Sequence, residues 1–246
     1  MRQETSLEGR RVLVSGGTTG IGRATVALLA REGARVLTFG RHEPELRDSL
    51  ESARQGRGIV DGLTADAGTR EGVERVFKKV DKVLGGLDIL VACAALGADP
   101  LSEMAEDDWR YVVETNLLGY LACSRKAIDR MKNQGGGQLV LIGSISADIK
   151  APGESVYAAT KGGIQAFAET LRKEVAQDNI RVTLIEPGSV GSDMQECSVD
   201  EQRKAIAQHH MLAAEEIAEA IAFTLTRSPN CDIVTLRIEP RLQKAA

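Results

Sequence analysis

Tyr157 and Lys161 are the residues of this 246-residue chain whose types and spacing most directly suggest chemistry. They lie four positions apart in a segment with helical pattern, so both side chains should project from one helix face. A phenol with a pKa near 10 is a poor base at neutrality, and lowering that pKa by about 2 units needs about 3 kcal/mol of extra phenolate stabilisation. A neighbouring ammonium group acts in that direction. The pair favours proton transfer by Tyr157; a half-buried tyrosine beside a solvated lysine is the alternative.

Two further polar residues could complete a site around Tyr157. Ser144 lies thirteen residues before Tyr157, at the carboxyl end of a predicted strand, where its hydroxyl could hydrogen-bond a substrate carbonyl. Ser146 competes for this role on position alone. Asn116 lies within a long helical pattern, where a buried amide is unusual unless its hydrogen bonds are satisfied.

A glycine-rich turn follows the first predicted strand and precedes a helix. It reads Ser15-Gly16-Gly17-Thr18-Thr19-Gly20-Ile21-Gly22-Arg23. Glycines permit a tight turn and let a phosphate approach the backbone, and the helix N-terminus offers unpaired N–H groups to a pyrophosphate. The spacing differs from the common G-x-G-x-x-G pattern. The turn therefore indicates a dinucleotide site; the alternative is a turn that only packs the helix against the strand.

The residues after the second predicted strand bear on the choice between NAD and NADP. An acidic residue there would bind the ribose 2′-hydroxyl of NAD, but the chain has Gly40 followed by Arg41. Gly40 cannot repel a 2′-phosphate and Arg41 could pair with one. We therefore predict that NADP is preferred and that NAD is possible; a solvated arginine is the alternative.

The elements that must position these residues alternate between strand and helix patterns. Near-continuous runs of Val, Ile and Leu predict strands at Arg11–Ser15, Arg35–Phe39, Gly58–Leu63, Asp88–Ala92, Gln138–Gly143, Arg181–Glu186 and Ile233–Ile238. Helical patterns lie at Gly20–Glu32, Glu43–Arg54, Thr69–Leu84, Glu106–Asn133, Glu154–Gln177 and Ala214–Thr226. This alternation predicts one α/β domain over residues 1–246, a seven-stranded parallel sheet with helices on both faces.

The segment Gly188–Met211 interrupts this alternation. It follows a strand, has only a weak helical pattern and is longer than a typical connection. Ligands of open α/β sheets bind beyond the carboxyl ends of the strands. We therefore expect the segment to be a lid over a substrate.

Composition and charge exclude several classes of protein. The chain has 25 glycines and only 3% aromatic residues, so Val, Leu, Ile and Ala must build the core. A net charge of −4 without a basic block argues against nucleic-acid binding. The longest apolar run, about Ile89 to Leu96, is too short for a membrane helix, and the polar first ten residues give no sign of a signal peptide. The cysteines, Cys93, Cys123, Cys197 and Cys231, show no metal or redox spacing, so we expect free thiols in a reducing cytoplasm and no metal site.

Taken together, these motifs resemble the short-chain dehydrogenase/reductase family over nearly the whole chain. The family's T-G-x-x-x-G-I-G motif matches Ser15 to Gly22, with serine in place of threonine. Its Tyr-x-x-x-Lys pair matches Tyr157 and Lys161, its catalytic serine matches Ser144, and its N-x-x-G asparagine matches Asn116. The adenine-contacting aspartate matches Asp66, the P-G motif matches Pro187-Gly188, and the threonine that follows is replaced by Ser192.

Two segments depart from the family pattern. The family's N-N-A-G after the fourth strand is Ala92-Cys93-Ala94-Ala95 here, so contacts to the adenosine ribose must differ. The C-terminal segment Asp232–Pro240 lacks the usual V-D-G-G ending and is similar to a subgroup that reduces ketones and oxidises 3-hydroxy acids.

The resemblance implies a Rossmann-like, doubly wound fold and an NADP-dependent oxidoreductase that interconverts a ketone and a secondary alcohol. Ser144, Tyr157, Lys161 and Asn116 would form the catalytic tetrad, with Asn116 holding a water that links Lys161 to solvent. The implied cofactor site comprises Gly16, Thr18, Thr19, Gly20, Ile21, Gly22, Arg41, Asp66, Ala67, Tyr157, Lys161, Pro187, Gly188, Val190 and Ser192. A homotetramer is expected, or a homodimer.

Two alternatives in function stay open. A non-catalytic nucleotide sensor or scaffold could use the same fold, because fold alone does not determine function. The second alternative is a dehydrogenase that works mainly in the oxidative direction on 3-hydroxy acids, sugars or steroids.

Overall fold

Short aliphatic strands build a single parallel sheet in the computed structural model, which describes residues 5–195 and 197–243. Within these residues the sheet has seven strands in the order β3-β2-β1-β4-β5-β6-β7. The strands are β1 (Arg11–Ser15), β2 (Arg35–Gly40), β3 (Ile59–Thr64), β4 (Ile89–Ala92), β5 (Gly137–Ile142), β6 (Ile180–Pro187) and β7 (Thr235–Ile238). All neighbouring pairs are parallel. The predicted α/β class, with seven parallel strands, is confirmed.

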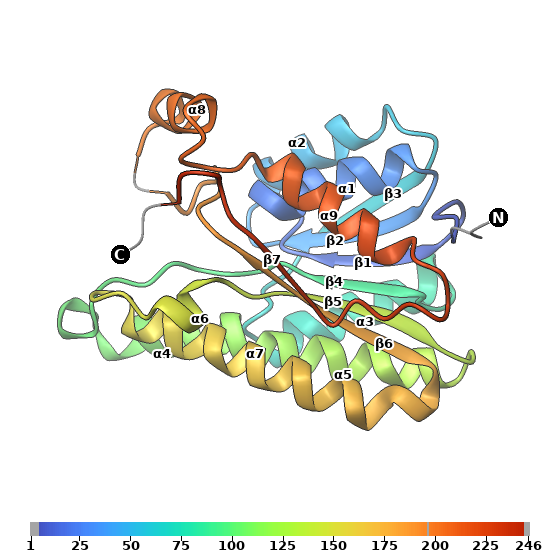
Figure 1. Cartoon of the computed structure of the whole chain (residues 1–246). Coiled ribbons are helices and arrows are strands. Elements are labelled where there is room, and N and C mark those ends of the chain that lie inside the picture. The colour runs from blue at the N-terminus through green and yellow to red at the C-terminus, as the bar shows by residue number, and fades with distance from the viewer. Residues whose placement is uncertain (1–4, 196, 244–246) are drawn as a thin grey trace.

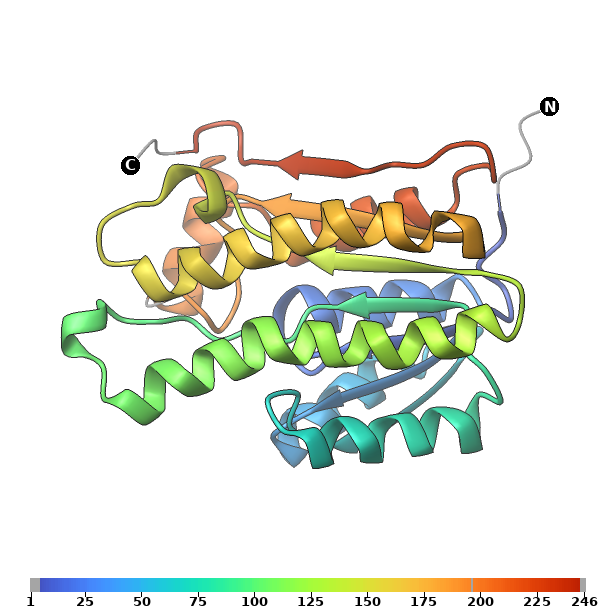
Figure 2. The same cartoon turned by 90° about the horizontal axis from the view of Figure 1, so that it is seen from below.

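Helices cover both faces of the sheet (Figure 1). On one face lie α1 (Gly20–Arg31), α2 (Glu43–Ala53) and α9 (Ala214–Leu225). On the other lie α3 (Arg70–Val83), α4 (Glu106–Val113), α5 (Gly119–Lys132) and α7 (Ser155–Val175), as the view from below shows (Figure 2). The shorter elements are η1 (Leu101–Glu103), the π-helix η2 (Glu114–Leu118), α6 (Ser146–Ile149), η3 (Ala176–Asp178) and α8 (Val199–Ala207).

The hydrophobic core forms two layers, one on each side of the sheet. Leu13, Leu90 and Leu139 face the helices α3, α5 and α7, whereas Val12, Val91 and Val140 face α1 and α9. Successive strand residues point to opposite faces, so a strand buried on both sides needs an apolar residue at nearly every position. This requirement explains the near-continuous aliphatic runs.

The long helix expected over Glu106–Asn133 is interrupted. The chain forms α4, one π-helical segment η2 and then α5 without leaving the helix axis. A π-helical bulge adds a residue to the turn and changes the direction of the side chains around it; such bulges are frequent at functional sites. Asn116 lies inside η2 and is fully buried.

The carboxyl ends of all the strands lie at one edge of the sheet, where the arrowheads in Figure 2 point. The expected lid over residues 188–211 lies at this edge and contains α8, which projects beyond the sheet in Figure 1. Glu196 of this segment lies outside the described residues. No helix in the described part of the chain is both long and apolar enough to cross a membrane.

Candidate functional site

Two adjoining cavities lie at the carboxyl edge of the sheet. The glycine-loop cavity, of about 580 Å³, is lined by residues of the first turn and by the ends of β2, β3 and β4. The tyrosine cavity, of about 560 Å³, is lined by Tyr157, Ser144 and the segments that follow β4, β5 and β6. Gly97 and Met194 line both cavities. The two cavities therefore share a wall.

The backbone of the first turn is held in a shape that glycine alone permits at low cost. Gly16 has a φ of +67° and Gly20 a φ of +48°, which is the left-handed region. A Cβ on Gly16 would lie 2.6 Å from Cα of Ala94, and one on Gly20 would lie 3.0 Å from Cβ of Ser192. Thr19, which precedes α1, makes no side-chain cap to the described residues. The first N–H groups of α1 therefore suit an anionic ligand.

Ser15 holds the backbone of the unusual segment Ala92–Ala95, and Asn116 holds Leu96, which directly follows it. The Ser15 hydroxyl accepts hydrogen bonds from the backbone N–H groups of Cys93 (3.1 Å) and Ala94 (3.3 Å). Asn116 Nδ2 donates to the Leu96 carbonyl and its Oδ1 accepts from the Leu96 N–H, both at 2.8 Å. The segment is thus held through its backbone, which explains how small residues can replace the amide side chains of the family pattern.

Most of the predicted cofactor residues line the glycine-loop cavity. They are Gly16, Thr18, Thr19, Gly20, Ile21, Gly22, Arg41, Asp66, Ala67 and Ser192. Tyr157 and Gly188 line the tyrosine cavity instead. Pro187, Val190 and Lys161 are absent from the described lining of both.

A hydrogen-bonded chain of three side chains includes Arg41 and Asp66, which both line the glycine-loop cavity. Arg41 Nη1 donates to the Tyr111 hydroxyl at 3.1 Å, and that hydroxyl donates to Asp66 Oδ2 at 2.6 Å. Asp66 Oδ1 accepts from the Gly68 N–H at 2.8 Å. Burial and the Asp66 hydrogen bond raise the pKa of Tyr111, so the phenol keeps its proton. Sequence reasoning missed Tyr111, because no local pattern links residues 41, 66 and 111.

Thr115 is a second residue that sequence reasoning missed. It lies in η2 and lines the glycine-loop cavity, and its buried hydroxyl has no hydrogen-bond partner among the described residues. A buried hydroxyl usually has a partner. The helix bulge that buries Asn116 also brings Thr115 to the cavity wall.

Ser144 and Tyr157 meet in the tyrosine cavity. Ser144 Oγ accepts a hydrogen bond from the Ser146 N–H at 3.1 Å, and the Ser144 side chain lies close enough to the Tyr157 phenol to act on its pKa. Burial raises the pKa of Tyr157 to about 12, with Glu154 acting in the same direction and Ser144 in the opposite one. The cost of burying a phenolate therefore outweighs any lowering by the neighbouring lysine in this structure, and the expected activation of Tyr157 by Lys161 stays a prediction.

Lys161 lies behind Tyr157 with only 1% of its surface exposed. Its Nζ donates to the Ile142 carbonyl at 2.9 Å and lies 5.5 Å from the ring centres of Tyr157 and Tyr120. The Tyr120 hydroxyl donates to the same carbonyl at 3.2 Å. Burial lowers the pKa of Lys161 to about 8. Such a perturbed group next to a cavity is typical of a functional site.

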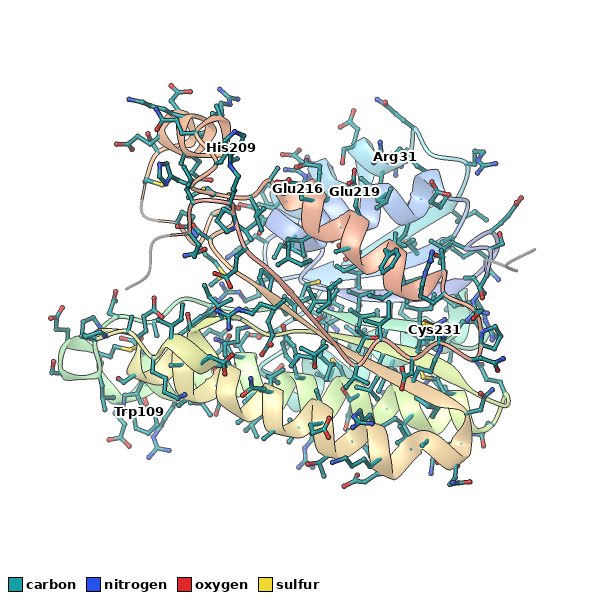
Figure 3. The ribbon with its side chains drawn as sticks, viewed as in Figure 1. Arg31, Trp109, His209, Glu216, Glu219 and Cys231 are labelled. Atoms are coloured by element: carbon teal, nitrogen blue, oxygen red, sulfur yellow. The ribbon has the colours of Figure 1, made fainter. Side chains whose placement is uncertain are left out.

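The lid and the C-terminal segment also contribute to the tyrosine cavity. Met194 and Gln195 of the lid segment line it. Gln243 of the C-terminal segment lines it too, and its Oε1 accepts from the Ser189 N–H at 3.0 Å. Sequence reasoning missed Gln243 because the C-terminal segment reaches the cavity only through tertiary contacts. His209 follows α8 (Figure 3) and is absent from the described lining of both cavities.

Asp148 and Lys150, which follow Ser144 in the chain, are not among the lining residues of the tyrosine cavity. Asp148 instead accepts hydrogen bonds from Gln165 on α7 (3.1 Å) and Arg237 on β7 (3.3 Å). These bonds tie α6, which follows Ser144, to two neighbouring elements.

The charged residues that line the tyrosine cavity are both acidic. Within the described residues they are Asp99 and Glu154. Glu154 lies close enough to Tyr157 to raise its pKa. In the same part of the chain, no group of three or more His, Cys, Asp or Glu residues could hold a metal ion, and the four cysteines are free thiols.

Comparison with known proteins adds independent findings. Residues 10–203 match the family model for "short chain dehydrogenase". The chain is 32% identical over 236 residues to a 3-oxoacyl-[acyl-carrier-protein] reductase of Vibrio cholerae, covering 94% of each chain. It is 34% identical over 218 residues to carbonyl reductase family member 4 of Danio rerio, covering 88% of this chain and 91% of that one.

Solved structures show the same arrangement. L-sorbose reductase from Gluconobacter frateurii, in a complex with NADPH and L-sorbose, superposes with a TM-score of 0.86 at 25% identity. The match covers 98% of this chain and 100% of the other.

Proposed function

The chain belongs to the short-chain dehydrogenase family of oxidoreductases, which act on carbonyl and hydroxyl groups, and we propose that it is an NADP-dependent carbonyl reductase. The observation that carries this proposal is the shared wall between the two cavities. Ser144 and Tyr157 line the cavity that adjoins the glycine turn, so a ketone there would lie next to a nicotinamide. Holding two reactants side by side supplies much of the rate acceleration.

The glycine-loop cavity fits a dinucleotide. The uncapped N-terminus of α1 suits the pyrophosphate, and the turn at Gly16 and Gly20 leaves no room for a Cβ without displacing Ala94 or crowding Ser192. Asp66 and Thr115 would face the adenine, and Arg41 a 2′-phosphate. When bound, the cofactor supplies the hydride for reduction.

The proton chemistry belongs to Ser144 and Tyr157. Ser144 Oγ accepts from the Ser146 N–H, so the single hydroxyl proton of Ser144 can be donated to the Tyr157 oxygen or, once a substrate is bound, to its carbonyl oxygen. Tyr157, whose raised pKa keeps it protonated, donates its proton to that oxygen as the alkoxide charge develops. In the oxidative direction the proton returns to Tyr157.

Lys161 and Asn116 complete the proposed tetrad. The Lys161 ammonium, held by the Ile142 carbonyl, stabilises negative charge on Tyr157 once its proton has left, and it would hydrogen-bond the nicotinamide ribose. Asn116 positions the Leu96 backbone at the wall between the cavities, since both of its amide groups bond there. Any water that it binds must use its remaining hydrogen-bonding capacity.

Replacing Tyr157 with phenylalanine tests the proposed chemistry. NADPH oxidation is first screened against ketones, β-keto esters, quinones and sugars to find a substrate. The Tyr157→Phe variant should lose about 10²- to 10⁴-fold in kcat, the usual share of a general acid. Its Kd for NADPH, measured by fluorescence, is the control and should stay close to that of the wild type. Full turnover by the variant would exclude the assignment.

Replacing Arg41 with alanine tests the NADP preference. The wild type should bind NADPH more tightly than NADH, because Arg41 can pair with the 2′-phosphate. The Arg41→Ala variant should lose about tenfold or more in affinity for NADPH with little change for NADH, as a charge-assisted hydrogen bond contributes about 1.5–3 kcal/mol. Titration calorimetry with both cofactors gives the ratio. Tighter binding of NADH by the wild type would refute the preference.

The lid, the assembly and the location are part of the same proposal. Ser192, Asp193 and Met194 line the glycine-loop cavity, which supports residues 188–211 as a lid over cofactor and substrate.

On α7, Ala159 is exposed and a Cβ on Gly162 would meet open space within the described residues, so this face suits contact with another subunit. We propose a single cytoplasmic domain that assembles as a homotetramer or homodimer; a monomer in sedimentation would reject the assembly.

A further inference from the structure

Arg41 and Asp66 carry opposite charges and line the same cavity, yet they are joined through a third side chain. The Tyr111 hydroxyl accepts from Arg41 and donates to Asp66, so guanidinium and carboxylate are two hydrogen bonds apart. Tyr111 lies on α4, Arg41 follows β2 and Asp66 follows β3. Three separate elements thus meet at one hydroxyl.

We propose that Tyr111 is a positioning residue that determines cofactor specificity by holding Arg41 and Asp66 apart in their cofactor-ready positions. This inference rests on the proposed NADP preference. It gives α4 a part in recognising the 2′-phosphate. The sequence motifs assign that recognition only to Arg41, which follows β2.

A direct ion pair between Arg41 and Asp66 would remove both groups from the cofactor. A guanidinium and a carboxylate form strong paired hydrogen bonds when they meet, and such a pair would occupy the donors needed by the phosphate. In this structure the Tyr111 hydroxyl takes the place of such a pair: it accepts from Arg41 Nη1 and donates to Asp66 Oδ2, while the Gly68 N–H donates to Oδ1. Each carboxylate oxygen keeps a further acceptor site for the cofactor. The remaining N–H groups of the Arg41 guanidinium then stay available to the cavity.

Tyr111 also limits the freedom of an exposed side chain. The Arg41 guanidinium carbon lies 5.6 Å from the centre of the Tyr111 ring, within the range of a cation–π contact. The ring lies beside Gly68, where a Cβ would come within 3.3 Å of Cε2 of Tyr111, so the absence of a side chain at Gly68 gives the ring its place. Fixing a long side chain before binding reduces the ordering cost that binding must meet.

The test compares Tyr111→Phe in two backgrounds. The substitution removes one oxygen and keeps the ring, so packing on Gly68 is retained. We expect the Kd for NADPH to rise about five- to tenfold, as for the loss of one hydrogen bond of about 1–1.5 kcal/mol, and the Kd for NADH to change less. In the Arg41→Ala background the same substitution should leave the ratio of the two Kd values unchanged. Thermal melting of each variant establishes that it is folded.

The outcomes separate this inference from the proposed function. The inference is supported if Tyr111→Phe lowers the preference for NADPH in the otherwise wild-type protein but leaves the ratio of the two Kd values unchanged in the Arg41→Ala background. If the wild type prefers NADPH and Tyr111→Phe keeps that preference, the inference is overturned while the proposed function stands. An equal loss of preference in both backgrounds also overturns it, because Tyr111 would then act without Arg41. A wild type that prefers NADH overturns the proposed NADP preference and, with it, this inference.

Discussion

The two cavities differ in how their walls are shaped. The glycine-loop cavity is lined by residues of six segments, at 16–22, 39–45, 65–67, 93–97, 115 and 192–194, and the first of these is a turn whose shape is set by the positive φ angles of Gly16 and Gly20. The tyrosine cavity takes its wall from four segments that span residues 97–100, 144–157, 188–195 and 243. Both cavities depend on how distant segments pack, but the glycine-loop cavity also contains a local backbone motif that the sequence reveals.

Charge separates the cavities as well. The glycine-loop cavity combines the N-terminus of α1 and Arg41, which both favour phosphate groups, with the carboxylates of Glu45, Asp66 and Asp193. The tyrosine cavity has Asp99 and Glu154 as its charged lining within the described residues. The glycine-loop cavity thus offers positive groups to an anionic cofactor, whereas the charged side chains of the tyrosine cavity disfavour an anionic substrate.

The largest effect is expected at Lys161, behind the tyrosine cavity. Lys161→Met should lower kcat/KM by about 10³-fold, since Tyr157 loses the charge that stabilises its phenolate. The same substitution should stabilise the fold at pH 7 by up to about 3 kcal/mol. This is the free-energy cost of keeping a buried ammonium charged when burial lowers its pKa from 10.5 to about 8. Activity and thermal melting at pH 7 give both values.

The cost of burying the charged Lys161 side chain depends on pH. The folded-state pKa lies below the unfolded value, so the cost is fully present below about pH 8 and is relieved as the pH rises toward 10.5. The stability advantage of Lys161→Met should therefore shrink over that range. A variant that melts several degrees lower than the wild type at pH 7 would contradict this account.

Ser144 and Ser146 offer a matched pair inside the tyrosine cavity, since both line it. Ser144→Ala should reduce kcat by about 100-fold, the typical effect of removing one donor to a developing oxyanion. Ser146→Ala should have a much smaller effect, because only the backbone N–H of Ser146 bonds Ser144 Oγ in the described contacts. Steady-state kinetics with the substrate found by screening compares the two variants. Equal losses of kcat would contradict the assignment of the catalytic role to Ser144 and not to Ser146.

The smallest effect sharpens the contrast in charge. With 4-acetylbenzoate and its methyl ester as matched ketones, the wild type should favour the uncharged ester. Glu154→Gln should narrow the ratio of the two kcat/KM values by about two- to fivefold, the size of a partly exposed charge interaction of up to about 1 kcal/mol. The ratio cancels any general effect of Glu154 on Tyr157. An unchanged ratio would show that Glu154 does not select against negative charge.

The strand pattern predicted the sheet closely. The helix pattern predicted one continuous helix over Glu106–Asn133, where the structure has a π-helical bulge between α4 and α5. The first strand, Arg11–Ser15, is found at its predicted bounds, because a strand buried on both faces leaves an unambiguous aliphatic run. The break around Asn116 could not be predicted, since hydrogen bonds between its side chain and Leu96, twenty residues away, accompany the π-helix. Helix α8 also escaped prediction, because its apolar pattern is weak.

The sequence by itself determined the family, the parallel sheet and the residues gathered at its carboxyl edge, because each depends on local patterns of spacing and hydrophobicity. The tertiary structure alone decided that Tyr111 joins Arg41 to Asp66, that Gln243 reaches the tyrosine cavity and that burial raises the pKa of Tyr157. These properties arise from contacts between segments distant in the chain and from the exclusion of water. Neither leaves a periodic trace in the sequence.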